Sequence, residues 1–129
     1  MKDDTRNWIK YAGENLQSAK LLLKAGIFNP CLQNAQQSVE KSLKALLIEN
    51  SRKLQKTHSI NELESILSGK GISINISEEE RDLLDSIYLP SKYPLGSSLP
   101  DFEPNAEICA ECVSIAERVF SDVSLILGH

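Results

Sequence analysis

Apolar residues recur at steps of three and four along the first part of the chain, which is the spacing of one helix face. The pattern predicts a helix over residues 5–25. Asp3, Asp4 or Thr5 is expected to cap its start, and Gly26 supplies the left-handed residue that often closes a helix. The apolar positions are Trp8, Ile9, Ala12, Leu16, Ala19, Leu22 and Leu23.

Two further stripes of the same period predict two further long helices. One begins at Pro30, which the first turn of a helix tolerates. Its apolar positions are Leu32, Ala35, Val39, Leu43, Leu46 and Leu47. The other stripe closes the chain and consists of Cys109, Cys112, Val113, Ala116, Val119, Phe120, Val123, Ile126 and Leu127.

Two short helices are predicted between the long ones. Each opens with a serine followed three residues later by a glutamate, the pattern of a capping box: Ser59 with Glu62, and Ser77 with Glu80. The first is expected to end near Gly69. Pro90 is expected to stop the second, because proline disrupts a helix interior. Residues 72–76 alternate like a strand, but a lone strand has no partner, so an extended connector is predicted.

These elements predict an all-α fold, an antiparallel up-and-down helical bundle of three long and two short helices. With 129 residues, 41% hydrophobic and 25% charged, the chain has the composition of one globular domain over residues 1–129. Residues 89–104 are rich in proline and serine and predict a long loop, which in a small domain is often functional.

The charge and the cysteines restrict the function classes. A net charge of −4 argues against a non-specific nucleic-acid binder, although a local basic face remains open. Three cysteines, an odd number, favour a reducing compartment. The charged N-terminus resembles no signal peptide, and no segment has the length of a membrane span. A cytoplasmic protein without membrane association is therefore expected.

No metal or cofactor is predicted. Cys109 and Cys112 have the spacing of half a zinc site, but no second pair of ligands accompanies them. Both lie on the apolar stripe of the last helix, where free cysteine behaves as a small buried hydrophobe. The two cysteines are therefore expected to lie in the core.

The polar face of the second long helix carries Gln37, Lys41 and Lys44 in one row, beside Glu40. Amides and ammonium groups can bind bases and phosphate. A solvated face, stabilised by pairing of Glu40 with Lys44, explains the same pattern, and it is the favoured interpretation.

His58 lies in a basic connector immediately before the first capping box, where it can meet a ligand or form a local contact, and the local contact is favoured. Tyr88, Lys92 and Tyr93 place two phenols and an ammonium group at the proline-rich segment. They can stack on a base and bind phosphate, or they can anchor the loop to the bundle.

Taken together, these segments resemble the HEPN domain family of higher eukaryotes and prokaryotes over nearly the whole chain. The specific part is the glutamine- and lysine-containing run of the second helix followed by Lys-Thr-His. The resemblance is carried by Trp8, Ala12, Leu16 and Ala19, by residues 36–47, by Lys56-Thr57-His58-Ser59-Ile60, and by Tyr88 with Lys92-Tyr93-Pro94.

The resemblance implies a homodimeric bundle that binds a nucleotide or an RNA-related ligand and acts with a minimal nucleotidyltransferase partner, in some members as a toxin–antitoxin pair. The expected ligand-binding residues are Gln37, Lys41, Lys44, His58, Lys92 and Tyr93. The two alternatives are a metal-independent ribonuclease toxin and a structural dimerisation or adaptor bundle.

Ribonuclease members of the broader superfamily carry an arginine followed four to six positions later by a histidine, near the start of the last long helix. Here that region holds Lys92-Tyr93-Pro94 instead, so a non-catalytic member is favoured. Arg52 and His58 have a permitted spacing but lie between two earlier helices. If RNA is cleaved, His58 is expected to act as the general base, and Arg52 or Lys92 to stabilise the phosphate.

Overall fold

The computed structural model describes residues 1–51, 53, 55–92 and 104–128. Within these ranges it contains five helices, which confirms the all-α bundle of three long and two short helices. They are α1 (Asp3–Ala25), α2 (Phe28–Asn50), α3 (Ile60–Gly69), α4 (Glu78–Lys92) and α5 (Ala106–Leu127).

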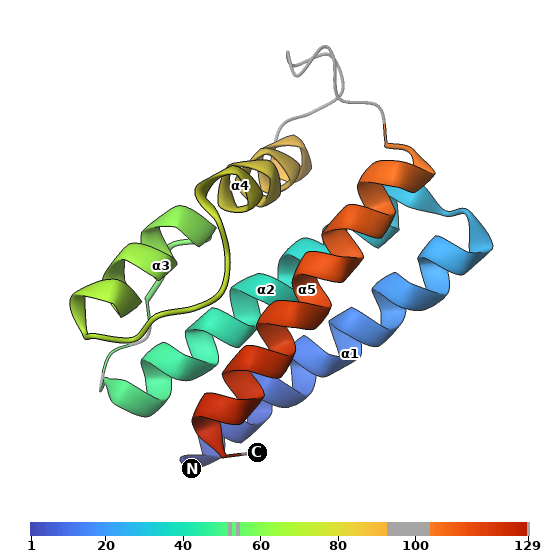
Figure 1. Cartoon of the computed structure of the whole chain (residues 1–129). Helices are drawn as coiled ribbons and strands as arrows, with labels where there is room; N and C mark the ends of the chain where they lie inside the picture. Colours follow the sequence, from blue (N-terminus) through green and yellow to red (C-terminus); the bar gives the residue numbers. More distant parts are fainter. Residues whose placement is uncertain (52, 54, 93–103, 129) are drawn as a thin grey trace.

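The three long helices pack side by side, and α3 and α4 cover another side of α2 (Figure 1). α1 runs opposite to both α2 and α5, and the two ends of the chain lie at one end of the bundle. α2 and α5 are therefore parallel. This is feasible because the chain passes through α3 and α4 before it enters α5.

α2 is the central helix, since it contacts each of the other four. Small residues of α1 and α2, among them Ala12 and Ser38, are fully buried where the two helices meet and let their backbones approach closely. The hydroxyl of Ser38 uses this proximity and donates a hydrogen bond to the carbonyl of Ala12 at 2.9 Å. Burial extends around α2, so even its polar residues Gln36, Glu40 and Lys44 are buried.

Several predicted helix ends are confirmed. Gly26 closes α1 with a φ of 73°. The predicted capping box at the start of α3 is half formed: the hydroxyl of Ser59 accepts a hydrogen bond from the Glu62 amide, but the Ser59 amide donates to Thr57 and not to Glu62. Ser77 and Glu80 form the full capping box at the start of α4, with bonds of 2.9 and 3.2 Å.

Two predicted helix ends are wrong. The N-cap of α1 is Lys2, and no side chain caps the helix there. Its ammonium group instead donates to the carbonyls of Ile48 and Ser51, while Thr5 donates to Glu49. The start of α1 is thus fixed by the end of α2. The second wrong end is that of α4, which Pro90 does not stop. The helix continues to Lys92, because proline removes only one backbone donor, and it ends two residues after the proline.

The apolar stripe of α5 faces the core as predicted, except at Ile126. That side chain is 46% exposed, whereas Leu127 in the same turn is partly buried against the core. The connector between α3 and α4 contains no strand, as predicted, but it is not extended throughout: it bends at Asn75, where the Ile76 amide donates to the carbonyl of Ile74 at 2.8 Å. It buries Ile74 and Ile76 against the core. Among the described residues, no helix combines the length and the apolar character that a membrane crossing requires.

Candidate functional site

A buried carboxylate on α2 organises the polar residues of the candidate site. Glu40 is only 3% exposed. Its Oε1 accepts a hydrogen bond from Gln36 at 3.2 Å, and its Oε2 accepts one from Lys44 at 3.0 Å. Oε2 also lies 3.1 Å from Nδ1 of His58, which comes from the connector between α2 and α3. The carboxylate thus joins the central helix to a residue far along the chain.

The imidazole of His58 is held on a second side by an aromatic ring. It stacks on Tyr88 of α4, with ring centroids 4.9 Å apart and planes inclined by 24°. The His58 side chain is 44% exposed, whereas Glu40 beneath it is buried. The two rings therefore form a partly open surface over a closed polar layer. The contacts of His58 reach α2 and α4, so they are not the local ones that the sequence favours.

Lys44 is buried as well, although the sequence favours a solvated polar face. Its ammonium group pairs with Glu40 and lies 5.7 Å from the ring centre of Trp8 on α1. The predicted pairing with Glu40 is present, but the predicted exposure is wrong. The reason is tertiary: Trp8 lies beside Lys44, and His58 packs over Glu40. A helix-face pattern does not show what the rest of the chain places on that face.

The remaining predicted ligand residues divide between two networks. Gln37 joins the Glu40 network, because its amide donates to Gln36 at 2.8 Å. Lys41 instead donates to Asn15 of α1 at 2.8 Å. The structure thus brings Gln37, Lys44 and His58 into one network and places Lys41 in another. Arg52, Tyr93 and the side chain of Lys92 lie outside the described residues.

The sequence does not place Glu40 among the expected site residues, and it does not predict that Tyr88 stacks on His58. The spacing of Gln36, Glu40 and Lys44 showed that these side chains could pair along α2. It could not show that His58 packs on Glu40, because that contact depends on the path of the connector. Tyr88 was recognised as an aromatic residue near the proline-rich segment, but its ring stacks on His58 from within α4.

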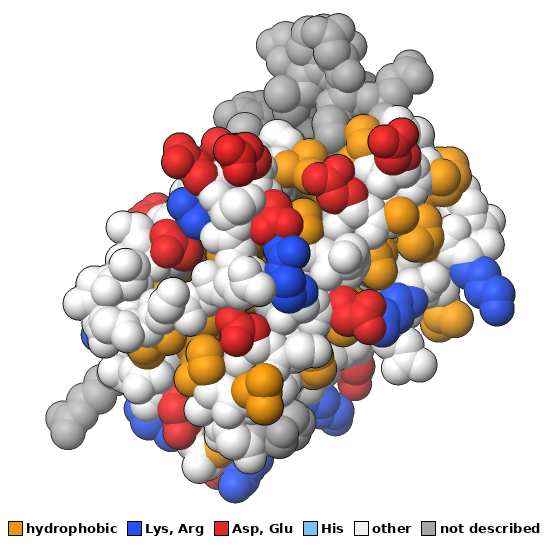
Figure 2. All heavy atoms as spheres, in the orientation of Figure 1, with side chains coloured by type: hydrophobic (Ala, Val, Ile, Leu, Met, Phe, Trp, Pro, Cys, Tyr) orange, Lys and Arg blue, Asp and Glu red, His pale blue; other side chains and the backbone are white. Residues whose placement is uncertain are grey.

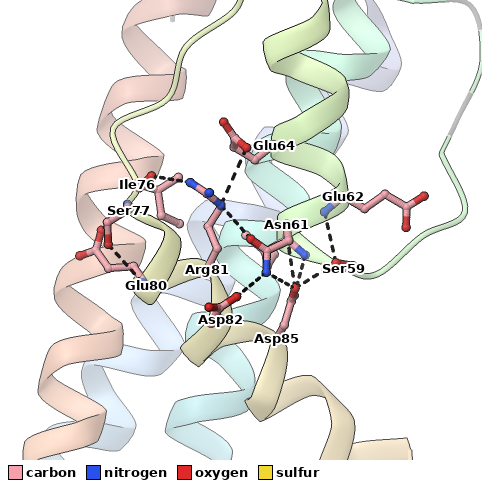
Figure 3. A network of polar contacts seen from close by, with 11 residues as sticks. Ser59, Asn61, Glu62, Glu64, Ile76, Ser77, Glu80, Arg81, Asp82 and Asp85 are labelled. Carbon is pink, nitrogen blue, oxygen red and sulfur yellow. Dashed lines mark hydrogen bonds and ion pairs between the residues drawn. The ribbon is translucent and has the colours of Figure 1, made fainter.

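A second polar network joins the start of α3 to the first half of α4 (Figure 3). Asp85 of α4 accepts hydrogen bonds from Ser59, Ile60 and Asn61 at the start of α3. Arg81 donates to Asn61 and to the carbonyl of Ile76. These contacts fix the segment that follows His58 onto the same helix that supplies Tyr88.

Charge is distributed unevenly over the surface. Figure 2 shows carboxylates gathered over α4 and the first half of α5, and no histidine is visible among the coloured atoms of that face. Two exposed cations, Lys53 and Lys56, precede His58 in the connector. An anionic ligand is therefore better matched to the connector than to the face in Figure 2.

The cysteines form part of the core, as the sequence favours. Cys31, Cys109 and Cys112 are free and buried. Burial raises the pKa of Cys31 and of Cys112 to about 12, and it also raises the pKa of Cys109. The part of the chain that the structure describes contains no group of three or more metal-binding side chains.

These features define a small helical bundle with a polar surface at the junction of α2, α3 and α4. The HEPN domain family model matches residues 5–126, and the chain belongs to this family. No curated protein sequence matches the chain significantly.

Two solved structures resemble the chain over almost its full length. The crystal structure of TT1696 from Thermus thermophilus is 24% identical, with a TM-score of 0.75, and the match covers 95% of this chain and 98% of that one. The structure of ST0689, an archaeal HEPN homologue, is 26% identical, with a TM-score of 0.71, covering 96% and 97%. The first comparison supports the fold alone.

Proposed function

We propose that this protein is a HEPN module that binds a nucleotide or an RNA-related ligand at the surface formed by His58 and Tyr88. The proposal rests mainly on the stacked ring pair, which is partly open to solvent above the buried pair of Glu40 and Lys44. A base can extend such a stack, since base–aromatic stacking contributes about 1–3 kcal/mol per base.

The polar groups around the stack suit the rest of a nucleotide. Because Nδ1 of His58 lies against Glu40, Nε2 is the ring nitrogen that remains for a ligand. Lys56 and Lys53 are exposed in the same connector and can neutralise phosphate. Lys44 is a less suitable phosphate ligand, because its charge is already balanced by Glu40.

A partner completes the proposal. The family resemblance implies a minimal nucleotidyltransferase, and such a protein would itself handle a nucleoside triphosphate. We therefore propose that the module acts together with this enzyme and as a homodimer. Co-expression followed by affinity purification tests the pairing; a chain that elutes alone and is unaffected by any nucleotide would favour a structural adaptor bundle instead.

The ligand-binding proposal is tested by calorimetric titration with AMP and with ATP, with and without the nucleotidyltransferase. Tyr88→Leu removes the stacking ring and is expected to weaken binding about 5- to 150-fold, the equivalent of one lost base stack. Tyr11→Leu is the matched control, because Tyr11 is 50% exposed on α1. No heat with either nucleotide under any of these conditions would refute nucleotide binding.

Ribonuclease activity is a second candidate, favoured by the contact between Glu40 and His58. A carboxylate that holds Nδ1 orients an imidazole for proton transfer at Nε2. His58 could then deprotonate a ribose 2′-hydroxyl without a metal. Labelled RNA incubated in EDTA with the protein and with His58→Ala tests this directly. Cleavage lost in the variant supports the activity, and an intact substrate with both proteins excludes it under these conditions.

A further inference from the structure

Asp85 satisfies the start of α3 from a neighbouring helix. Its Oδ1 accepts a hydrogen bond from the Ile60 amide at 2.6 Å, and its Oδ2 accepts one from the Asn61 amide at 3.2 Å. The Glu62 amide, the third free donor of the first turn, is bonded to the hydroxyl of Ser59. Asp85 and Ser59 together therefore satisfy the amides of residues 60–62, and the fourth free amide, that of Ser59, donates to the hydroxyl of Thr57.

Asp85 also fixes the residue that follows His58. The hydroxyl of Ser59 donates to Oδ2 of Asp85 at 2.9 Å while it accepts from Glu62. Figure 3 shows the Asp85 carboxylate directed at Ser59 and Asn61 from α4. Each of these bonds ends on residues 59–61, so Asp85 contacts the chain beside His58 and not the imidazole.

The same helix supplies the ring on which His58 stacks. Asp85 and Tyr88 are three residues apart on α4, and residues at this spacing share one helix face. One face of α4 therefore makes two contacts: the Asp85 carboxylate binds backbone amides that follow His58, and the Tyr88 ring stacks on its imidazole. The third contact, with Glu40, is formed only if the connector stays in this position.

We infer that Asp85 is the positioning residue of the His58 surface: by capping α3 from α4 it holds the imidazole between Glu40 and Tyr88. Without this charge-assisted cap the connector has fewer fixed points, and His58 spends less of its time in the stacked position. An effect of Asp85 on ligand affinity rests on the proposed function, whereas its effect on the position of the His58 imidazole does not.

The test compares Asp85→Asn with Asp82→Asn, two variants that each remove one negative charge from the same helix. Asp82 is exposed and, among the residues that the structure describes, accepts a hydrogen bond only from the side chain of Asn61. NMR of the ring protons and nitrogens of His58 reports both the stack on Tyr88 and the contact with Glu40. We expect Asp85→Asn to shift these signals toward those of an exposed histidine and Asp82→Asn to leave them near the wild-type values.

AMP affinity is measured on the same samples. If the stacked position is populated for about a tenth of the time in Asp85→Asn, the dissociation constant rises about tenfold. Unchanged His58 signals in Asp85→Asn would overturn the inference even if AMP binds. Shifted signals without AMP binding by any sample would uphold it and refute the proposed nucleotide site.

If Asp85→Asn fails to fold, Ser59→Ala is used in its place for the NMR measurement. It removes the hydroxyl between Asp85 and the chain but leaves both backbone bonds to the carboxylate. The His58 signals should then shift in the same direction by a smaller amount, with the helical content unchanged. A folded Ser59→Ala protein with wild-type His58 signals would contradict the inference.

Discussion

Glu40 and His58 are 18 residues apart in the chain, yet Nδ1 of the histidine lies 3.1 Å from Oε2 of the glutamate. The same oxygen accepts a hydrogen bond from Lys44, so one buried carboxylate balances a buried cation and orients an exposed imidazole. The candidate site and the stability of the bundle therefore depend on the same group.

Replacement of Glu40 by glutamine should be strongly destabilising. It leaves the ammonium group of Lys44 buried without an opposite charge, and breaking a buried pair from one side costs about 3–5 kcal/mol of unfolding free energy. Urea denaturation measures the loss. Combining Glu40→Leu with Lys44→Leu should cost less than Glu40→Gln alone, because both buried charges are then removed.

The control is an ion pair of the same length at the surface. Lys20 and Glu117 are also 3.0 Å apart, but their side chains are 46% and 56% exposed. Glu117→Gln should therefore change the unfolding free energy by less than about 1 kcal/mol. Equal losses in Glu40→Gln and Glu117→Gln would show that the Glu40 pair is not effectively buried.

The helices were predictable because their signals are local. Stripes at steps of three and four, a glycine after the first helix and two serine–glutamate pairs identified the elements and most of their ends. The start of α1 was not predictable in this way, because Lys2 bonds to the end of α2. The site depends on such long-range contacts throughout: no local pattern places His58 on Tyr88 or Asp85 on the start of α3.

Loss of Arg118 should change the acid titration of Glu80. The guanidinium of Arg118 donates to this carboxylate and lowers its pKa below the ordinary 4.5. A pKa that is lower in the folded state stabilises the protein above the unfolded pKa, and this stabilisation disappears as the pH falls through the folded pKa. Arg118→Gln should raise the pKa of Glu80, as followed by carbon NMR of its carboxyl group.

The stability difference between wild type and Arg118→Gln should follow the same titration. It should be largest near neutral pH and shrink below pH 4.5, where Glu80 becomes protonated in both proteins. Denaturation at several pH values measures it. A difference that stays constant across this range would mean that Arg118 stabilises α5 through packing rather than through Glu80.

The three thiols should be inert in the folded protein. With a pKa of about 12, Cys31 and Cys112 carry a thiolate on only ~10⁻⁴ of molecules at pH 8, and both side chains are buried. An aromatic disulfide reagent should therefore react slowly, at a rate limited by opening of the bundle, and should titrate all three thiols at once in denaturant. Fast reaction of one thiol in the native state would place that cysteine at an accessible surface.

Gly13 provides a test of how α5 packs on α1. A Cβ built at this position would lie 3.2 Å from Cζ of Phe120, closer than an ordinary contact. Alanine in a helix is favoured over glycine by about 1 kcal/mol, but in Gly13→Ala this gain is opposed by the ring. In a Phe120→Leu background the obstruction is removed, so the same substitution should stabilise the protein by about 0.5–1 kcal/mol more than it does in the wild type. A double-mutant cycle measured by urea denaturation gives this coupling directly, and a coupling near zero would mean that the Phe120 ring moves aside without strain.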